Sequence, residues 1–295
     1  MKQLTVISGK GGTGKTTLVG SFAALAESTV IADCDVDAPD LHLLLHPELI
    51  KEEAFQGLHV AVMDRTKCIA CGSCEEACRF NAIASTGESG FVVNRTRCEG
   101  CGACVFVCAQ GAITLEARVS GHAFISKTSY GTMAHAQLNI AEEASGKLVT
   151  VVRDRALQIA EKEGCALILI DGAPGIGCPV IASLTGVDLA LIVTEPTMSG
   201  LHDLERILAV TRHFGIASTV CINKCDINEG NSRRIAEFCR ARGIAVVGSI
   251  PYDPVVTEAM VAGMPVVEFA GGGVVSDAIT DVWNGITSLL RLFSS

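Results

Sequence analysis

The chain has 295 residues, of which 49% are hydrophobic and only 19% charged, so it can bury a sizeable core and has no compositional sign of disorder. A net charge of -9, a pI near 5.3 and the lack of any Lys/Arg cluster argue against nucleic acid as a partner. No apolar run reaches membrane-spanning length, and the N-terminus carries no secretion signal. We therefore expect a folded cytoplasmic protein whose 14 cysteines are ligands or small buried side chains rather than disulfides.

A strand-like run, Leu4–Ile7, a glycine-rich loop and a helical pattern, Leu18–Ala26, come first in the chain. The loop, Gly9–Thr17, fits the pattern G-x-x-x-x-G-K-[ST]. Such a loop points backbone N–H groups at phosphate oxygens, and the following helix adds its positive N-terminal end. Lys15 should reach the β- and γ-phosphates, and Thr16 should hold Mg²⁺. The motif predicts nucleotide binding by Gly11, Gly12, Thr13, Gly14, Lys15, Thr16 and Thr17.

A second lysine, Lys10, follows the first glycine of this loop. The stretch from Lys10 to Thr16 resembles the deviant Walker A motif of the MinD/ParA family and of the nitrogenase iron protein. In that family the extra lysine crosses a nucleotide-sandwich dimer and contacts the partner's phosphates. The resemblance thus implies an ATP-dependent homodimer in which Lys10, like Lys15, takes part in catalysis; a solvated loop lysine is the alternative.

The next strand-like run, Thr29–Ala32, ends in three acids, Asp33, Asp35 and Asp37. Ligands bind at this end of the strands in open α/β sheets. The family resemblance implies that Asp33 supports the Mg²⁺ shell and that Asp35 is the catalytic switch I residue that orients the attacking water. A polar loop without a role in the site is the alternative interpretation of the three acids. We expect Cys34, between them, to be a small buried side chain.

Two runs of cysteines with spacing C-x2-C-x2-C-x3-C lie between residues 68 and 108. Because the fourth cysteine of each run ligates the other cluster in a duplicated ferredoxin motif, we predict two 4Fe-4S clusters. The predicted ligands are Cys68, Cys71, Cys74 and Cys108 for one cluster, and Cys98, Cys101, Cys104 and Cys78 for the other. Zinc is the competing interpretation of C-x2-C pairs. Bacterial ferredoxins usually carry proline after the fourth cysteine, where this chain has Arg79 and Ala109.

These runs divide the chain into a predicted ATPase domain, residues 1–62 and 118–295, and an inserted ferredoxin domain, residues 63–117. The ends of the insertion should lie close together, because the chain leaves and re-enters one sheet. After it we expect a strand at His122–Ser126, a helix or helix-like loop at Ala134–Ala144 and an amphipathic helix at Val149–Glu163.

The apolar run Ala166–Ile170 ends in Asp171, as a buried parallel strand with a Walker B carboxylate would. Asp171 is therefore a predicted Mg²⁺ ligand. The stretch Gly172–Pro179 resembles switch II of the family, a flexible loop beside the γ-phosphate. Within it, Cys178 is either a packed thiol, which we favour, or a ligand of a cluster that bridges two subunits.

Two later apolar runs end at Asn223 and at Pro251-Tyr252-Asp253. In the family the corresponding positions hold the nucleotide base. Asn223-Lys224-x-Asp226 also spells the guanine-reading motif of GTPases, but the resemblance favours adenine. We treat Cys165, Cys221, Cys225 and Cys239 as core residues, because they have no ligand spacing.

The last predicted helix, Ser276–Leu292, carries a broad apolar face formed by Ile279, Val282, Trp283, Ile286, Leu289, Leu290 and Phe293. MinD proteins bind membranes with a C-terminal amphipathic helix, but such a helix needs a basic polar face, and here only Arg291 is available. We therefore expect this helix to pack against the sheet and do not expect membrane binding.

Over nearly its full length the sequence resembles MinD-superfamily ATPases that contain an inserted ferredoxin. The implied fold is α/β: a mostly parallel, doubly wound P-loop NTPase sheet with a small inserted α+β domain of the bacterial-ferredoxin kind. Three roles are compatible with it: a nucleotide-gated electron carrier, an ATP-dependent iron-sulfur or metallocofactor assembly protein, and a MinD-like spatial organiser with redox-sensing clusters. Electron transfer is favoured, because eight cysteines in ferredoxin spacing hold clusters stably. The partner would be an unidentified redox or cofactor-assembly protein.

Overall fold

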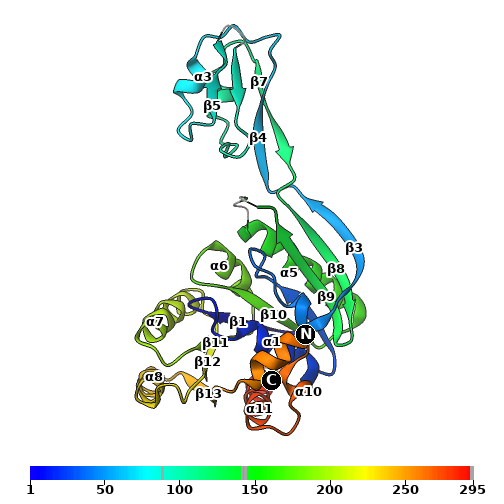
Figure 1. The fold of residues 1–295 in the computed structure, drawn as a ribbon, viewed down its shortest axis with the longest axis vertical. Coiled ribbons are helices and arrows are strands. Elements are labelled where there is room, and N and C mark those ends of the chain that lie inside the picture. Colours follow the sequence, from blue (N-terminus) through cyan, green and yellow to red (C-terminus); the bar gives the residue numbers. More distant parts are fainter. Residues whose placement is uncertain (88–89, 141, 143–144, 293–295) are drawn as a thin grey trace. The chain divides into compact units, whose positions relative to one another are not determined.

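The structure is a computed structural model that describes residues 1–87, 90–140, 142 and 145–292 (Figure 1). The chain forms two compact units: the first comprises Met1–Glu53, Ala123–Gln137 and Ser145–Ser295, and the second Ala54–His122 and Leu138–Ala144. The stretch 63–117, expected to be an insertion, lies inside the second unit. The second unit is larger than the expected insertion: it starts at Ala54, runs to His122 and also takes in the short segment Leu138–Ala144.

The main sheet has the strand order β13-β12-β11-β1-β10-β2-β9-β8-β3, and its strands from β13 to β9 pair in parallel. The strands β2 and β11 are buried along their whole length, which explains the apolar runs Val30–Ala32 and Leu189–Val193 within them. The strand bounds are β1 Lys2–Ser8, β2 Thr29–Asp33, β3 Glu48–Phe55, β8 Gly121–Thr128, β9 Gly131–Leu138, β10 Leu167–Pro174, β11 Leu189–Thr194, β12 Ser218–Asn223 and β13 Ala245–Ile250.

Helices connect strands of the main sheet, and three further helices follow its last strand in the chain. Their bounds are α1 Lys15–Leu25, α2 His42–Leu45, α5 Ser145–Glu163, α6 Cys178–Leu184, α7 Met198–His213, α8 Glu229–Ala241, α9 Val255–Val261, α10 Val266–Phe269 and α11 Val274–Leu292. One core cluster joins α1 and α11 to the sheet, and a separate cluster joins α6, α7 and α8 to it. The mostly parallel α/β fold expected from the sequence is confirmed (Figure 1).

The C-terminal helix α11 packs on the sheet, as its apolar face predicts. Ile279, Val282 and Ile286 are at most 1% exposed, and the ring of Trp283 stacks on that of Phe22 with centroids 5.2 Å apart. Phe293, expected on the same face, lies outside the described residues.

The expected helix over Ala134–Ala144 is wrong for its first part, because residues up to Leu138 belong to β9. Alanine has a high helix propensity, but this segment pairs in parallel with β2, from Thr132 opposite Val30 to His135 opposite Asp33. Pairing with a neighbouring strand thus overrides local propensity. Residues 141, 143 and 144 of the expected helix lie outside the described part of the chain.

A smaller difference concerns switch II. The strand β10 continues past Asp171 to Pro174, and the backbone N–H of Gly175 donates to the Ser8 carbonyl at 2.9 Å. The segment expected to be a loop from Gly172 onward therefore begins as the end of a strand.

In the second unit, β4 (Leu58–Met63) pairs antiparallel with β7 (Ile113–Arg118), and β5 (Ile83–Ser85) pairs with β6 (Phe91–Val93). Two short helices, α3 (Ser73–Glu76) and α4 (Ala103–Val107), follow the second cysteine of each run. The chain leaves the main sheet after β3 and returns to it in β8, and these two strands are adjacent in that sheet.

The two cysteine runs fold as repeats offset by 30 residues. The Asp64 N–H donates to the Ala112 carbonyl at 2.7 Å, and the Asn94 N–H donates to the Ala82 carbonyl at the same distance. Positive φ angles recur at equivalent positions: Ala70 and Gly100, Gly72 and Gly102, and Asn81 and Gly111. The internal sequence similarity is therefore a repeat of backbone conformation.

Candidate functional site

The glycine-rich loop leads from β1 into α1, and glycine is required at two of its positions. Gly12 and Gly14 have φ angles of 76° and 92°, a region that favours glycine. A Cβ atom on Gly14 would also lie 2.4 Å from Nδ2 of Asn223. The loop thus places the N-terminus of α1, which starts at Lys15, at the carboxyl edge of the sheet.

Asn223, at the end of β12, fixes this loop. Its Nδ2 donates to the Thr13 carbonyl at 2.8 Å. Thr13 is 3% exposed, and its Oγ1 has no hydrogen-bond partner among the described residues. The residue expected to hold the base is thus also a support for the phosphate-binding loop.

Lys15 lies among the predicted magnesium and switch carboxylates. Its Nζ is 3.7 Å from Oδ2 of Asp35 and 3.9 Å from Oδ1 of Asp171. Burial raises the pKa of Asp171 to about 6, although the nearby Lys15 charge opposes the shift. Burial and the charge of Asp171 also raise the pKa of Asp33 well above its usual range. The structure therefore gathers a buried cation and three acids at one edge of the sheet.

The carboxylate oxygens at this edge suit a magnesium ion. Both carboxylate oxygens of Asp171 and Oδ2 of Asp33 are buried and lack a hydrogen-bond partner in the described residues. Buried carboxylate oxygens without hydrogen bonds are costly, and Mg²⁺ usually takes one or two carboxylates together with phosphate oxygens and waters. Across the described chain, no group of three or more His, Cys, Asp or Glu side chains is arranged to hold a metal by itself.

A cavity of about 710 Å³ opens beside the phosphate-binding loop, a size that falls in the range of small-molecule sites. Most of the residues predicted to bind nucleotide line this cavity, although they come from distant parts of the sequence. Its lining includes Gly11, Gly12, Gly14, Lys15, Thr16, Thr17, Asp35, Asn223, Pro251, Tyr252 and Asp253. Three other predicted residues are buried and do not line the cavity: Thr13, Asp33 and Asp171.

Lys10 takes a different direction from Lys15. Its Nζ forms an ion pair with Oε2 of Glu195 at 3.1 Å, at the end of β11. Oε1 of Glu195 accepts from Nζ of Lys224 at 2.5 Å, and Lys224 also reaches the Gly12 carbonyl at 3.3 Å. Sequence reasoning missed Glu195, because no motif marks it.

The side chains of the Asn-Lys-x-Asp stretch are engaged with the protein. Besides the contacts of Asn223 and Lys224, Oδ1 of Asp226 accepts from the backbone N–H of Tyr252 at 2.7 Å. Asp226 therefore holds the loop that lines the cavity, and it does not itself line the cavity.

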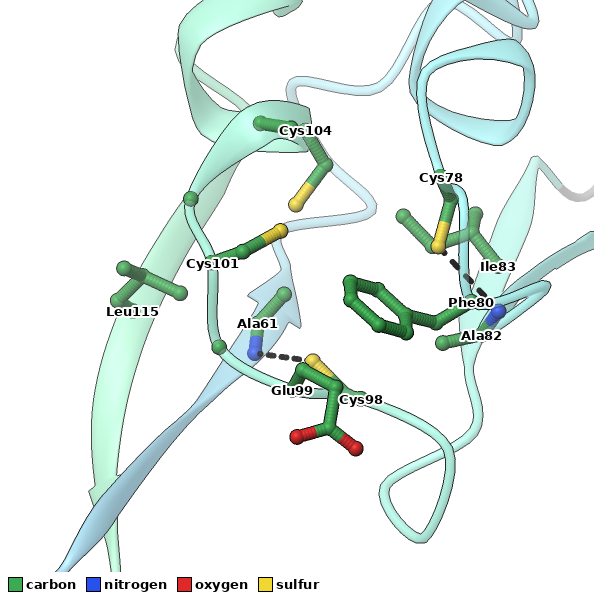
Figure 2. Close-up of a pocket in the computed structure, with 13 residues that line it drawn as sticks. Ala61, Cys78, Phe80, Ala82, Ile83, Cys98, Glu99, Cys101, Cys104 and Leu115 are labelled. Carbon is green, nitrogen blue, oxygen red and sulfur yellow. Dashed lines mark hydrogen bonds between the residues drawn. The ribbon is translucent and has the colours of Figure 1, made fainter.

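In the second unit, one cavity is lined by Cys98, Cys101, Cys104 and Cys78, the four cysteines assigned to one cluster. Figure 2 shows Cys98, Cys101 and Cys104 on one side of this space and Cys78 on the other. A second cavity is lined by Cys68, Cys71, Cys74 and Cys108, the other assigned set. Each cavity therefore has in its lining the four cysteines that the sequence analysis assigns to one cluster.

Backbone amides point at the cysteine sulfurs of both cavities. Ala82 N–H donates to Sγ of Cys78 and Ala112 N–H to Sγ of Cys108, both at 3.3 Å. Ala61 N–H donates to Sγ of Cys98 at 3.4 Å (Figure 2). Hydrogen bonds to the sulfurs tune the potential of iron-sulfur clusters. The donor set therefore fits sulfur-ligated clusters.

The remaining cysteines mostly behave as expected. Cys34, Cys221 and Cys239 are buried, and Cys165 and Cys225 are half-buried. The expectation of a packed thiol at Cys178 is wrong, because this residue is exposed. It is the first residue of α6 and directly follows Gly177.

None of the helices in the described ranges combines the length and the apolar character needed to cross a membrane.

Comparisons with known proteins agree with this geometry. Residues 4–266 match the family of CobQ/CobB/MinD/ParA nucleotide-binding domains. An uncharacterized protein of Methanocaldococcus jannaschii is 34% identical over 234 residues, which is 78% of this chain and 80% of that protein. The iron-sulfur cluster carrier protein of Aquifex aeolicus is 29% identical over 112 residues, 34% of this chain and 31% of the carrier.

Among solved structures, the septum site-determining protein MinD of Pyrococcus horikoshii, complexed with Mg-ADP, shares the fold with a TM-score of 0.60. The two sequences are 16% identical, and the alignment covers 99% of this chain and 98% of the MinD chain. With the phosphate-binding loop, the carboxylates and the cavity in place, the chain belongs to the CobQ/CobB/MinD/ParA family of nucleotide-binding domains and is a P-loop ATPase of that family.

Proposed function

We propose that this ATPase is an iron-sulfur protein that works as a nucleotide-gated electron carrier. The observation that carries the proposal is the grouping of the eight ferredoxin-type cysteines around two cavities, four to each, in the second unit. When bound, two 4Fe-4S clusters would supply one-electron redox chemistry at these cavities.

In the first unit we assign ATP and Mg²⁺ to the large cavity. Lys15 and the N-terminus of α1 would hold the phosphates, while Thr16, Asp33 and Asp171 would hold Mg²⁺ directly or through water. Asp35, 3.7 Å from Lys15, would orient the attacking water. Adenine would lie against Asn223 and the loop Pro251–Asp253.

The segment that transmits the nucleotide state would be the one that follows Asp33 and Asp35. The chain runs from Asp35 and α2 into β3, which leads directly to the second unit. A nucleotide-dependent shift of this segment would be passed along β3 to the cysteine-bearing unit. Loops that are ordered by contacts with a γ-phosphate and released on its hydrolysis are a known way to couple hydrolysis to movement.

A second candidate is ATP-dependent assembly of iron-sulfur or other metal cofactors. The similarity to the Aquifex aeolicus iron-sulfur cluster carrier protein favours it. In that role the clusters would be cargo and would leave the protein. A MinD-like role at the membrane receives less support, because the apolar face of α11 is buried against the sheet.

Measurement of the iron content of anaerobically purified protein tests the proposal. We expect about eight irons and eight acid-labile sulfides per chain, with the broad visible absorption of iron-sulfur clusters. The iron should stay bound when ATP and an apo acceptor protein are added, whereas a cluster carrier would lose it. Stoichiometric zinc without visible absorption would contradict both candidates.

Cys71 and Cys178 form a matched pair for the iron measurement, because both are exposed. Cys71→Ala should lower the iron content by about half, since it removes a ligand of one cluster. Cys178→Ala should leave it unchanged. Loss of iron in the Cys178 variant would instead indicate a bridging cluster between subunits.

A further inference from the structure

Glu195 is the shared anchor of two lysines on the phosphate-binding side of the sheet. Its two carboxylate oxygens bind different partners, Oε2 with Lys10 at 3.1 Å and Oε1 with Lys224 at 2.5 Å. The two lysines lower the pKa of the Glu195 carboxyl despite its partial burial. It is therefore ionised at neutral pH, and its side chain is only 13% exposed.

The backbone around Lys10 is fixed, so its side chain alone can move. Ser8 Oγ donates to the Lys10 carbonyl at 2.7 Å. Gly9 is pressed against α7, where an added Cβ would lie 2.2 Å from Cβ of Asp203. The Lys10 side chain is 37% exposed, so leaving Glu195 would need no unfolding of the loop.

The ion pair can open at low cost. When Lys10 leaves, Glu195 still holds Lys224, whose Nζ also contacts the Gly12 carbonyl. The carboxylate is then not left as an unpaired buried charge, which would be strongly destabilising. Lys10 itself would move from a half-exposed pair to solvent or to another anion.

We propose that Glu195 is a positioning residue that holds Lys10 within its own subunit and so opposes ATP-dependent dimerisation. The proposal rests on the role that the deviant Walker A resemblance implies for Lys10, a contact with the partner's phosphates in an ATP-dependent dimer. In each subunit Lys10 must exchange Glu195 for a phosphate of the neighbouring nucleotide. Glu195 therefore sets the ATP analogue and protein concentrations at which the dimer forms.

The test uses Glu195→Gln in the full-length protein, because glutamine keeps the shape and a hydrogen-bond acceptor but removes the charge. Glu205→Gln is the matched control, since Glu205 pairs with Arg242 at 3.4 Å on the surface. The first readout is the rate at which an amine-reactive reagent labels Lys10, followed by peptide mass spectrometry. We expect Glu195→Gln to speed labelling of Lys10 roughly threefold, as suits a partly exposed pair, and Glu205→Gln to leave it unchanged.

The second readout is the dimer dissociation constant by analytical ultracentrifugation with a slowly hydrolysed ATP analogue. Two pairs open for each dimer, so we expect Glu195→Gln to tighten the dimer about fivefold or more. ADP affinity of the monomer should stay the same or fall, because the Lys224 contact with Gly12 loses its anchor. A role confined to loop stability would instead weaken ADP binding and dimerisation together.

The double variant Glu195→Gln with Lys10→Ala separates two claims: that Glu195 holds Lys10, and that Lys10 contacts the partner. The tightening should vanish in the Lys10→Ala background, because the lysine that it releases is gone. Unchanged Lys10 labelling, or a weaker dimer in Glu195→Gln, would overturn the positioning role. If Lys10→Ala alone dimerises like the natural protein, Lys10 does not contact the partner's phosphates. The labelling rate of Lys10 in Glu195→Gln then still decides whether Glu195 holds the Lys10 side chain.

Discussion

Lys10 and Lys15 lie on one loop but in different surroundings. The Lys15 side chain is 6% exposed and faces Asp35 and Asp171, whereas that of Lys10 is 37% exposed and faces Glu195. A buried lysine beside the predicted magnesium carboxylates is placed to hold phosphate in its own subunit. Lys10 does not line the cavity, so it is not placed to hold phosphate in its own subunit.

Substitution of each lysine should therefore have a different effect. Lys15→Ala should abolish nucleotide binding, because it removes the buried positive charge of the cavity. Lys10→Ala should keep nucleotide affinity within about twofold, since partly exposed ion pairs contribute little, yet lose dimerisation with an ATP analogue and most hydrolysis. Isothermal titration and sedimentation measure the two properties; equal loss of nucleotide affinity in both variants would show that Lys10 acts within its own subunit.

A half-buried histidine on β9 makes stability depend on pH. His135 Nε2 lies 2.9 Å from Oγ of Ser126, and the ring stacks on Phe124 with centroids 5.1 Å apart. Burial, with a smaller effect of His42, lowers its pKa to about 4. Because the folded protein holds this imidazole neutral, its contribution to stability is complete above about pH 6.5, the unfolded value.

As pH falls from about 6.5 to 4, the unfolded chain takes up this proton before the folded chain does, so the free energy of unfolding should decrease. The expected loss is on the order of 2 kcal/mol. Urea denaturation at several pH values measures it, with His135→Gln as the comparison. The variant should show a shallower pH dependence in this window, and parallel curves would contradict the assignment.

Sequence reasoning at the residue scale found the groups that motifs mark and missed those that only the fold brings together. Lys15 and Asp171 stand at fixed places relative to a strand, so their meeting could be predicted from the sequence. Glu195 and Lys224 are 29 residues apart and meet only because β11 and β12 are neighbours. No spacing rule encodes that contact.

At the scale of elements, hydrophobic runs predicted the buried parallel strands well, since burial on both faces leaves an unbroken apolar signal. The main error was β9, whose alanines match helix propensity although the strand is set by pairing with β2. The two cysteine runs were the clearest pattern in the sequence, and their equal spacing corresponds to a repeated backbone conformation.

Pairs of cysteine substitutions test the crossed grouping. Cys78 and Cys101 line the same cavity, whereas Cys78 and Cys71 line different ones. Cys78→Ala with Cys101→Ala should retain about four irons, because only one cluster loses ligands. Cys78→Ala with Cys71→Ala should retain almost none. Similar iron contents in the two double variants would contradict the crossed arrangement.

At the scale of the whole molecule, nucleotide gating requires that the ATPase unit and the cysteine-bearing unit exchange free energy. Two of the strands that run from the main sheet into the second unit, β3 and β8, are neighbours in that sheet. β3 follows the acidic segment after β2 in the chain, so a change at the nucleotide has a short covalent path to the cysteine-bearing unit. Any such coupling must act equally in both directions.

The most direct test is a spectroscopic redox titration of the clusters without nucleotide, in ADP and in an ATP analogue. Nucleotide gating predicts that the midpoint potential with the ATP analogue differs from that with ADP by about 30 mV or more, which for one electron equals about 0.7 kcal/mol and a roughly threefold change in ATP affinity on reduction. Lys15→Ala should show no such shift. Identical potentials of the natural protein in all three conditions would contradict nucleotide gating of its redox centres.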